Sequence, residues 1–351
     1  MTHSKYTAIP SPEIDALLDG ALPDIAAAVD ALHLPHLAGV VLGGGYGRGE
    51  GGVLHTSRGD KLYNDLDFFV FADRASRNEL TRIDRELGKV AEAWETRLGV
   101  AVDFGPAKNL AALENVASTL MFQELLHGWR PVWGDLDLAE VLPELPPEQL
   151  PFTEAARLLL NRGMGLLFAA NRLLADSTDR DFIVRNLNKA LLGGGDALLI
   201  ADGCYRWNGL ERTAELKKRC GEKKLPSGFS EAYEQAYRFK IEPQLSPEAA
   251  TLENWRRCRA FYLSAFAAVV GTSEDASETE QCAALREKAK DERSVKNFLR
   301  WLIRMRRTRT ARRLFDAPVI TVLESLHAVL SRENPPAECP EKLYLAWQKF
   351  N

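Results

Sequence analysis

Two acidic residues in a short apolar stretch are the first sign of chemistry in this sequence. Asp65 and Asp67 stand two positions apart, and Phe68–Phe71 directly after them is wholly apolar. Successive side chains of a β-strand point to opposite faces, so both carboxylates would lie on one face. They would repel each other unless a cation lay between them. A hard cation with oxygen ligands, Mg²⁺ by preference, meets this need and also binds nucleotide phosphates.

A glycine-rich run precedes these acids. Ala38–Leu42 is apolar with two adjacent valines, which predicts a buried strand, and it leads directly into Gly43–Glu50. Glycine lets the backbone approach a bulky anion, and a turn there directs several N–H groups toward it. We therefore expect the turn to bind phosphate, with Arg48 as a candidate for a further phosphate contact.

The order of strand, glycine turn and Asp-x-Asp strand resembles the DNA polymerase β-like nucleotidyltransferase superfamily, especially its bacterial members that act on small molecules and antibiotics. The run Tyr46–Glu50 is similar to one that is common in those members, and the resemblance covers about Pro35 to Gly134. It implies that Gly44 and Gly45 cradle the triphosphate of a nucleotide.

The same resemblance implies the metal site and the reaction. Asp65 and Asp67 would be metal ligands, and the third carboxylate of the family would be Asp103, in the later apolar run Gly99–Gly105. Asp103 would bind a second metal ion or act as the base. The implied enzyme holds one or two Mg²⁺ ions and transfers a nucleoside monophosphate from a nucleoside triphosphate, with ATP expected, to an acceptor hydroxyl or similar group. The acceptor itself stays open: a small molecule, a protein side chain or an RNA end. Pyrophosphate is released.

One departure from the family concerns the interval between Gly45 and Asp65, which is longer than usual. The extra residues, Gly51–Lys61, are expected to form a loop or a hairpin that could cover the site.

Other interpretations of the glycines are weaker. Gly47, Gly49 and Gly52 match the dinucleotide-binding spacing, and Asp67 lies about twenty residues on, but the acid of that motif ends a strand whereas Asp67 begins one. A protein-kinase loop lacks its partner motifs, and a Walker loop would need Gly-Lys-Ser/Thr. A plain glycine turn with surface aspartates is the remaining alternative.

Composition sets broader limits. The chain has 351 residues, a net charge of −4 and 46% hydrophobic residues, as in ordinary globular proteins of two domains. Its five cysteines form no C-x-x-C pair, so we expect reduced thiols and neither structural zinc nor disulfides. No signal peptide is apparent, and the longest apolar run, Phe261–Val270, is too short to cross a bilayer. A soluble, cytoplasmic protein is expected.

The elements that position the acids follow from periodicity. A leading helix is expected from Ser11, with a break near Pro23. Arg74–Leu98 has the apolar spacing of one helix face, Val100–Phe104 predicts a strand, and Leu110–Leu126 a further helix. A short strand and turn at Gly128–Gly134 would close this domain.

The fold class expected is α+β. Residues 1–142 would form a nucleotidyltransferase domain, a mixed sheet flanked by helices, and 143–152 a proline-rich linker. Helical spacing dominates 153–351, so an all-helical domain is expected there. One side of a helix in that domain carries Arg185, Lys189 and Asp196. This helix is similar to one in antibiotic-type nucleotidyltransferases, where Lys189 would contact the triphosphate; a structural pairing with Asp196 is the alternative.

Two further functions stay open. The protein could be a catalytically silent nucleotide-binding regulator or scaffold, although retention of three repelling carboxylates speaks against this. It could also be an RNA-directed transferase that uses Arg286–Arg313, where twelve basic residues stand against three acidic ones. A solvated basic face is favoured over a nucleic-acid site there.

Overall fold

A computed structural model describes residues 4–222, 225–294, 297, 315–334 and 336–349. Over this part the chain is a mixed α+β protein that divides into two compact units. The first comprises residues 1–146 with 238–244, and the second comprises residues 147–237 with 245–351. The boundary after Pro146 falls inside the proline-rich segment 143–152. Nothing in the sequence indicated that 238–244 would join the first unit.

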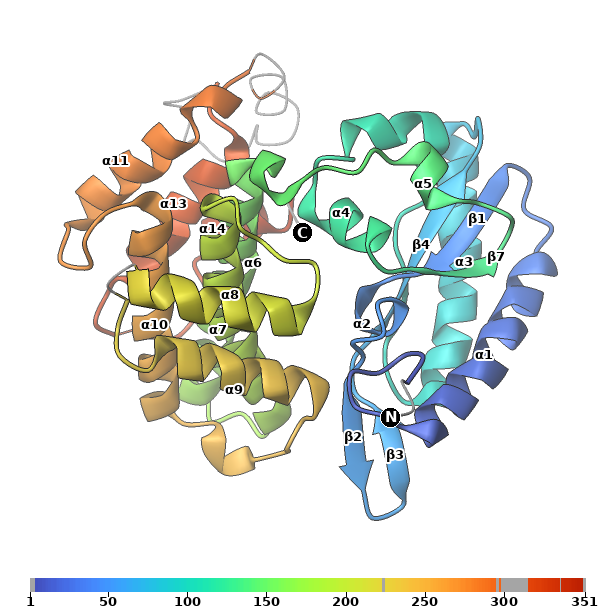
Figure 1. Ribbon diagram of the computed structural model, residues 1–351, viewed down its shortest axis with the longest axis horizontal. Coiled ribbons are helices and arrows are strands. Elements are labelled where there is room, and N and C mark those ends of the chain that lie inside the picture. Colours follow the sequence, from blue (N-terminus) through green and yellow to red (C-terminus); the bar gives the residue numbers. More distant parts are fainter. Residues whose placement is uncertain (1–3, 223–224, 295–296, 298–314, 335, 350–351) are drawn as a thin grey trace. The chain divides into compact units, whose positions relative to one another are not determined.

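A mixed sheet forms the centre of the first unit, with strand order β5-β4-β1-β7 (Figure 1). Strand β1 runs antiparallel to both of its neighbours. Strand β4 runs parallel to β5 and to the short β6, which also pairs with β4. The strands are β1 Leu37–Leu42, β4 Leu66–Ala72, β5 Val102–Phe104, β6 Lys108–Asn109 and β7 Arg130–Trp133. All but β6 correspond to segments predicted from the sequence.

The two faces of this sheet pack against different helices. Leu66, Phe68 and Val70 of β4 lie in a core with α1 (Pro12–Asp30) and α3 (Arg77–Leu98). Phe69 and Phe71 lie on the other face, with α4 (Leu120–Leu126) and α5 (Leu138–Val141). Figure 1 shows these two pairs of helices on opposite sides of the sheet. Because side chains alternate along a strand, position 67 faces the α4 side.

Two helix predictions are wrong in detail. Helix α1 is capped by Ser11, as expected, but it continues through Pro23 without a break. The buried residues on both sides of Pro23, from Ile14 to Val29, hold the helix together despite the missing hydrogen bond. The predicted helix Leu110–Leu126 is interrupted: a 3₁₀ helix spans Leu110–Asn115, and α4 starts only after Thr119, whose backbone is extended.

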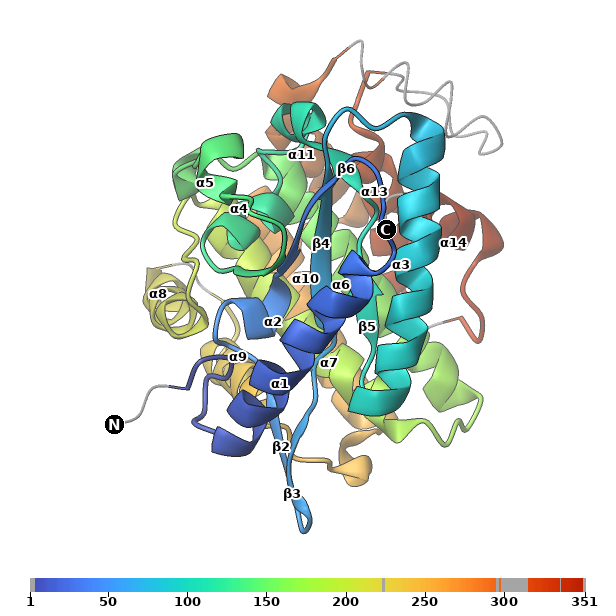
Figure 2. The same ribbon diagram turned by 90° about the vertical axis from the view of Figure 1, so that its right-hand side faces the viewer.

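The insertion after the glycine turn forms a hairpin, one of the two predicted forms. Strands β2 (Val53–Thr56) and β3 (Gly59–Leu62) make a two-stranded sheet of their own, which projects from the main sheet in both views (Figures 1 and 2). Ser11 Oγ donates to Asp60 Oδ2 at 2.7 Å, which lowers the pKa of Asp60. The hairpin is thereby attached to the start of α1.

The described part of the second unit contains helices and no strand. Its α-helices are α6 Phe152–Leu174, α7 Arg180–Ala201, α8 Gly209–Glu222, α9 Phe229–Ile241 (of which 238–241 belong to the first unit), α10 Leu252–Val270, α11 Glu278–Lys288, α13 Pro318–Leu330 and α14 Glu341–Trp347. Three consecutive glycines let α7 pack closely on several neighbours. A Cβ on Gly193 would lie 2.2 Å from Arg162 of α6, and one on Gly195 would lie 2.5 Å from the Tyr233 ring of α9.

Several sequence expectations can be compared with this unit. The five cysteines form no disulfide. Among the described helices, none has the length and apolarity needed to span a bilayer. Most of the basic segment Arg286–Arg313 lies outside the described residues, which omit 295–296 and 298–314. Its proposed role toward RNA therefore stays a prediction.

A buried histidine in the second unit makes stability depend on pH. His327 of α13 is 2% exposed and stacks on Phe266 of α10, with ring centroids 3.9 Å apart. Neither ring nitrogen has a hydrogen-bond partner in the described structure, and burial lowers the pKa of His327 to about 4. Between pH 6.5 and 4 the unfolded chain therefore binds a proton that the folded protein does not, so stability falls as the pH is lowered.

We expect His327→Phe to remove this dependence. Denaturant titrations at pH 7.5 and pH 5 should show that the wild type loses about 2 kcal/mol more unfolding free energy than the variant. His33→Asn, at an exposed histidine with a left-handed backbone, is the matched control and should behave as the wild type. Equal losses in wild type and His327→Phe would show that His327 is protonated in the folded state.

Candidate active site

The register of two parallel strands brings Asp67 and Asp103 side by side. Strands β4 and β5 pair Leu66 with Val102 and Asp67 with Asp103. Neighbouring strands lie about 4.8 Å apart, so paired residues point to the same face. Val102 is buried in the core with α1 and α3, which places Asp103 on the opposite face, as for Asp67. The structure therefore brings together two of the three acids singled out in the sequence.

Asp65 directly precedes β4, two positions before Asp67. Asp65 and Asp103 are both exposed, and neither side chain forms a hydrogen bond or ion pair within the described residues. Asp67 is partly buried and does have a further interaction. Two of the three carboxylates thus have no neutralising group from the described chain.

The glycine turn lies directly against this acidic face. It forms a short helix, α2 (Gly44–Gly47), and the N–H of Gly43 donates to the backbone oxygen of Asp67 at 2.8 Å. Gly44 has a left-handed φ of +60°, and a Cβ on it would lie 2.1 Å from Asp67 Oδ2. Only glycine fits here without displacing the carboxylate. The predicted phosphate turn and one predicted metal ligand are therefore in direct contact.

The amides of Gly44 and Gly45 are available for a ligand. They stand at the start of α2, where N–H groups have no acceptor within the helix. Neither amide has an acceptor among the described residues. The backbone oxygen of Gly45 accepts from the N–H of Glu50 at 2.8 Å, which closes the turn. This arrangement suits the phosphate contact that the sequence predicts for both glycines.

Arg48 contacts acidic side chains of its own unit. Its side chain is 11% exposed, with Nε 3.5 Å from Glu50 Oε2 and Nη1 3.5 Å from Glu124 Oε2. Gly128 leaves room for it, since a Cβ there would lie 2.2 Å from Arg48 Cγ. Arg48 therefore links the end of the turn to α4. Its predicted contact with phosphate stays a prediction.

The acids do not form a closed ligand set as they stand. Within the described ranges, no group of three or more His, Cys, Asp or Glu side chains is arranged to hold a metal ion. Mutually repelling carboxylates have no reason to converge without a cation, whereas the strand register already places their backbones together.

Comparison with known proteins identifies no family for this chain. No protein-family model matches it, and no match is found among curated proteins. The case for a function therefore depends on the residues themselves.

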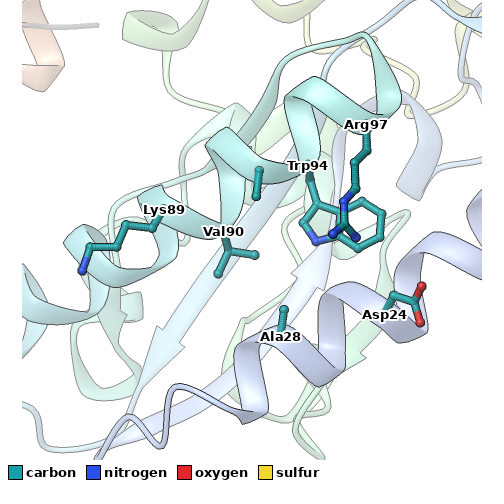
Figure 3. A pocket seen from close by; sticks show the side chains of 7 residues that line it. Asp24, Ala28, Lys89, Val90, Trp94 and Arg97 are labelled. Atoms are coloured by element: carbon teal, nitrogen blue, oxygen red, sulfur yellow. The ribbon is translucent and has the colours of Figure 1, made fainter.

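A groove elsewhere in the first unit offers different chemistry. It lies between α1 and α3 with a volume of about 430 Å³, on the sheet face opposite the aspartates (Figure 3). The guanidinium of Arg97 lies 4.8 Å from the ring centroid of Trp94, and Asp24 and Lys89 line the groove. It has one carboxylate and no glycine turn, so it lacks the parts of the predicted site.

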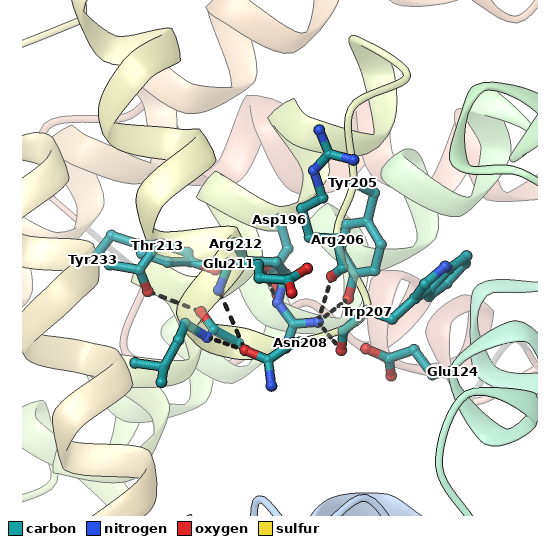
Figure 4. Close-up of polar contacts among 12 residues, drawn as sticks. Glu124, Asp196, Tyr205, Arg206, Trp207, Asn208, Glu211, Arg212, Thr213 and Tyr233 are labelled. Carbon is teal, nitrogen blue, oxygen red and sulfur yellow. Dashed lines mark hydrogen bonds and ion pairs between the residues drawn. The ribbon is translucent and has the colours of Figure 1, made fainter.

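The charged stripe of the second unit is built into α7. Lys189 is exposed, and Arg185 Nε lies 2.7 Å from Asp181 one turn earlier. Asp196 accepts a 2.5 Å hydrogen bond from the Tyr233 hydroxyl and lies 3.4 Å from Arg212 Nε (Figure 4). Burial raises the pKa of Tyr233 well above its usual value, so the phenol stays protonated and donates. Asp196 thus has a structural role, whereas the predicted triphosphate contact of Lys189 stays untested.

Sequence reasoning assigned no role to Tyr46 and Asn64, which connect the glycine turn to the two ends of the hairpin that precedes Asp65. The Tyr46 hydroxyl donates to Gly52 O at 2.8 Å and accepts from Tyr63 N at 3.0 Å, while Asn64 Oδ1 accepts from Gly52 N at 2.6 Å. Tyrosine within a glycine run was the only signal, and it did not specify these partners.

Proposed function

We propose that this chain is a metal-dependent nucleotidyltransferase, which transfers a nucleoside monophosphate from a nucleoside triphosphate to an acceptor hydroxyl. The observation that carries the proposal is the pairing of Asp67 with Asp103, together with the contact between Asp67 and Gly44. A phosphate-binding turn in contact with paired carboxylates is the minimum that this reaction needs. The resemblance to the DNA polymerase β-like superfamily supports the same reaction.

The chemical type of these residues, though not their present arrangement, suits a divalent cation. Asp65, Asp67 and Asp103 would hold one or two Mg²⁺ ions, because they supply hard oxygen ligands and carry negative charge that the described chain leaves uncompensated at two of them. When bound, Mg²⁺ neutralises charge on the phosphates and lowers the pKa of the acceptor hydroxyl.

The nucleotide would bind through its triphosphate. The amides of Gly44 and Gly45 would donate to the β- and γ-phosphates. ATP is the expected nucleotide. Under this proposal, residues 1–142 form the catalytic domain, 143–152 the linker and 153–351 a helical domain.

The reaction then proceeds by displacement at phosphorus. The acceptor oxygen attacks the α-phosphorus, the bond from that atom to the bridging oxygen of the β-phosphate breaks, and pyrophosphate leaves. As an alternative to binding a second metal ion, Asp103 could take the acceptor proton, because its carboxylate is exposed and forms no hydrogen bond or ion pair with described residues. The chain itself needs only to hold and orient the reactants.

Binding and turnover test this proposal separately. Calorimetry with ATP should detect binding that requires Mg²⁺ and that Asp65→Asn abolishes while the fold stays intact. A screen of α-labelled nucleoside triphosphates against acceptor hydroxyls should then show label transfer with release of pyrophosphate. Label transfer retained in Asp65→Asn would refute the metal assignment. Binding without turnover of any acceptor would instead favour a silent nucleotide-binding regulator.

A further inference from the structure

The base of the β2–β3 hairpin is held closed by side chains that adjoin the proposed site. Gly52 stands at one end of the hairpin, and Tyr63 and Asn64 stand at the other. The Tyr46 hydroxyl bonds to both ends, at 2.8 Å to Gly52 O and 3.0 Å to Tyr63 N. We call Tyr46, Gly52, Tyr63 and Asn64 the clasp.

Three of the four clasp residues are buried, and Asn64 is partly buried. Tyr46 is 1% exposed. A Cβ on Gly51 would lie 2.1 Å from the Tyr46 ring, so glycine at position 51 is what lets the ring lie there. Asn64 adds the third bond, with its Oδ1 2.6 Å from Gly52 N. A buried hydroxyl with two good partners is costly to remove, which makes the clasp a defined junction.

Along the chain, the clasp lies directly next to the glycine turn and directly next to Asp65. Tyr46 directly follows Gly45 of the phosphate turn, and Asn64 directly precedes Asp65. The turn is also attached to Asp67 by the bond from Gly43 N, but that bond lies two residues beyond Asp65. Strands β2 and β3 belong to a separate sheet, so the ladder of the main sheet does not restrain the chain that enters Asp65 from the hairpin.

We infer that Tyr46 and Asn64 are positioning residues, which hold the Asp65 carboxylate in place relative to the Gly44–Gly45 amides. This inference rests on the proposed function. If the clasp opens, Asp65 moves relative to a triphosphate still held by the turn. The metal requirement and the turnover number then change, whereas the nucleotide contacts made by the turn do not.

Tyr46→Phe tests the inference, because it removes both hydroxyl bonds and keeps the ring. We expect kcat to fall about 30-fold, since small misplacements of reacting groups cost up to about 10²-fold. The Mg²⁺ concentration for half-maximal turnover should rise, KM for ATP should change less than threefold, and excess Mg²⁺ should restore part of the rate. Amide exchange at Gly52 and Tyr63 should accelerate.

Two more variants complete the experiment. Tyr6→Phe is the matched control: it removes a buried hydroxyl of the same unit, 2.7 Å from Asp19, and should leave the Mg²⁺ requirement unchanged. Asn64→Ala opens the clasp from its other side and should reproduce the Mg²⁺ shift even if Tyr46→Phe does not fold.

The outcomes separate this inference from the proposed function. A wild type that neither binds Mg²⁺–ATP nor turns over overturns both. An active wild type whose kcat and Mg²⁺ requirement are unchanged in Tyr46→Phe and Asn64→Ala overturns the positioning role alone.

Discussion

Replacing Asp103 by Asn is expected to lower Mg²⁺-dependent nucleotidyl transfer about 10³-fold and to raise the melting temperature of the metal-free protein. Loss of a metal-binding carboxylate removes several kcal/mol of transition-state stabilisation, and about 4 kcal/mol corresponds to this factor. Stability should increase rather than fall, because Asp103 is paired with Asp67 across β4 and β5 and forms no ion pair with described residues. Removing one charge relieves their repulsion.

Asp24→Asn is the matched control for that variant. It makes the same change of charge in the same unit, on α1, whose core lies on the face of the sheet opposite Asp103. It should keep wild-type turnover. Thermal melts with and without Mg²⁺ complete the measurement: Mg²⁺ should stabilise the wild type and Asp24→Asn but not Asp103→Asn. A lower metal-free melting temperature for Asp103→Asn would mean that the carboxylate supports the fold rather than a metal.

The parts of the site that the sequence predicts correctly are encoded locally. Ala38–Leu42 and the run after Asp67 carry the apolar character of buried strands, and they form β1 and β4. The glycines of the turn mark a place where the backbone needs unusual freedom, and Gly44 has a positive φ there. Such signals need no knowledge of the rest of the chain.

The proximity of Asp67 to Asp103, in contrast, is not encoded locally in the sequence. Periodicity places each carboxylate on a strand, but only the register of β4 with β5 decides whether the two side chains share a face. The expectation that Asp103 joins Asp67 at one site came from the family resemblance. The strand register agrees with it at Asp67 and Asp103, whereas the metal itself stays a prediction.

The failed helix predictions show where local rules lose to packing. Pro23 removes one hydrogen bond from α1, yet the buried face of that helix outweighs the loss. In the opposite sense, the apolar pattern of Leu110–Leu126 does not give one continuous helix, because the 3₁₀ helix ends at Asn115 and α4 begins only after Thr119, whose backbone is extended. Side chains of Ser and Thr compete for backbone groups, which favours such interruptions.

Contacts made across long stretches of chain could not be predicted at all. Arg48 was expected at phosphate because of its place in the turn, but its ion pair with Glu124 depends on where α4 packs. The bond from Tyr46 to Tyr63 likewise depends on the closure of the hairpin between them. Residue type and spacing carry no information about either partner.

Gly44→Ala is expected to reduce turnover about 10²-fold by displacing Asp67. A non-glycine residue at φ +60° is strained by about 1 kcal/mol, and its Cβ would lie 2.1 Å from Asp67 Oδ2. The carboxylate must therefore shift relative to the turn, and a displacement on this scale costs about 10²-fold in rate. The affinity for ATP in the presence of Mg²⁺ should fall as well, because the neighbouring amides move together with Cα. Single-turnover assays and calorimetry measure the two effects.

Gly49→Ala tests the effect of left-handed backbone strain without a contact to Asp67. Gly49 also has a left-handed backbone, with φ +73°, but the nearest atom to its Cβ would be Lys5 O at 3.5 Å. Gly49→Ala should therefore lose about 1 kcal/mol of unfolding free energy from backbone strain, and Gly44→Ala at least as much. Only Gly44→Ala pushes against a metal-binding carboxylate, so only Gly44→Ala should lose most of its turnover. Equal loss of turnover in the two would attribute the effect to a loosened turn, and the contact between Gly44 and Asp67 would then have no catalytic meaning.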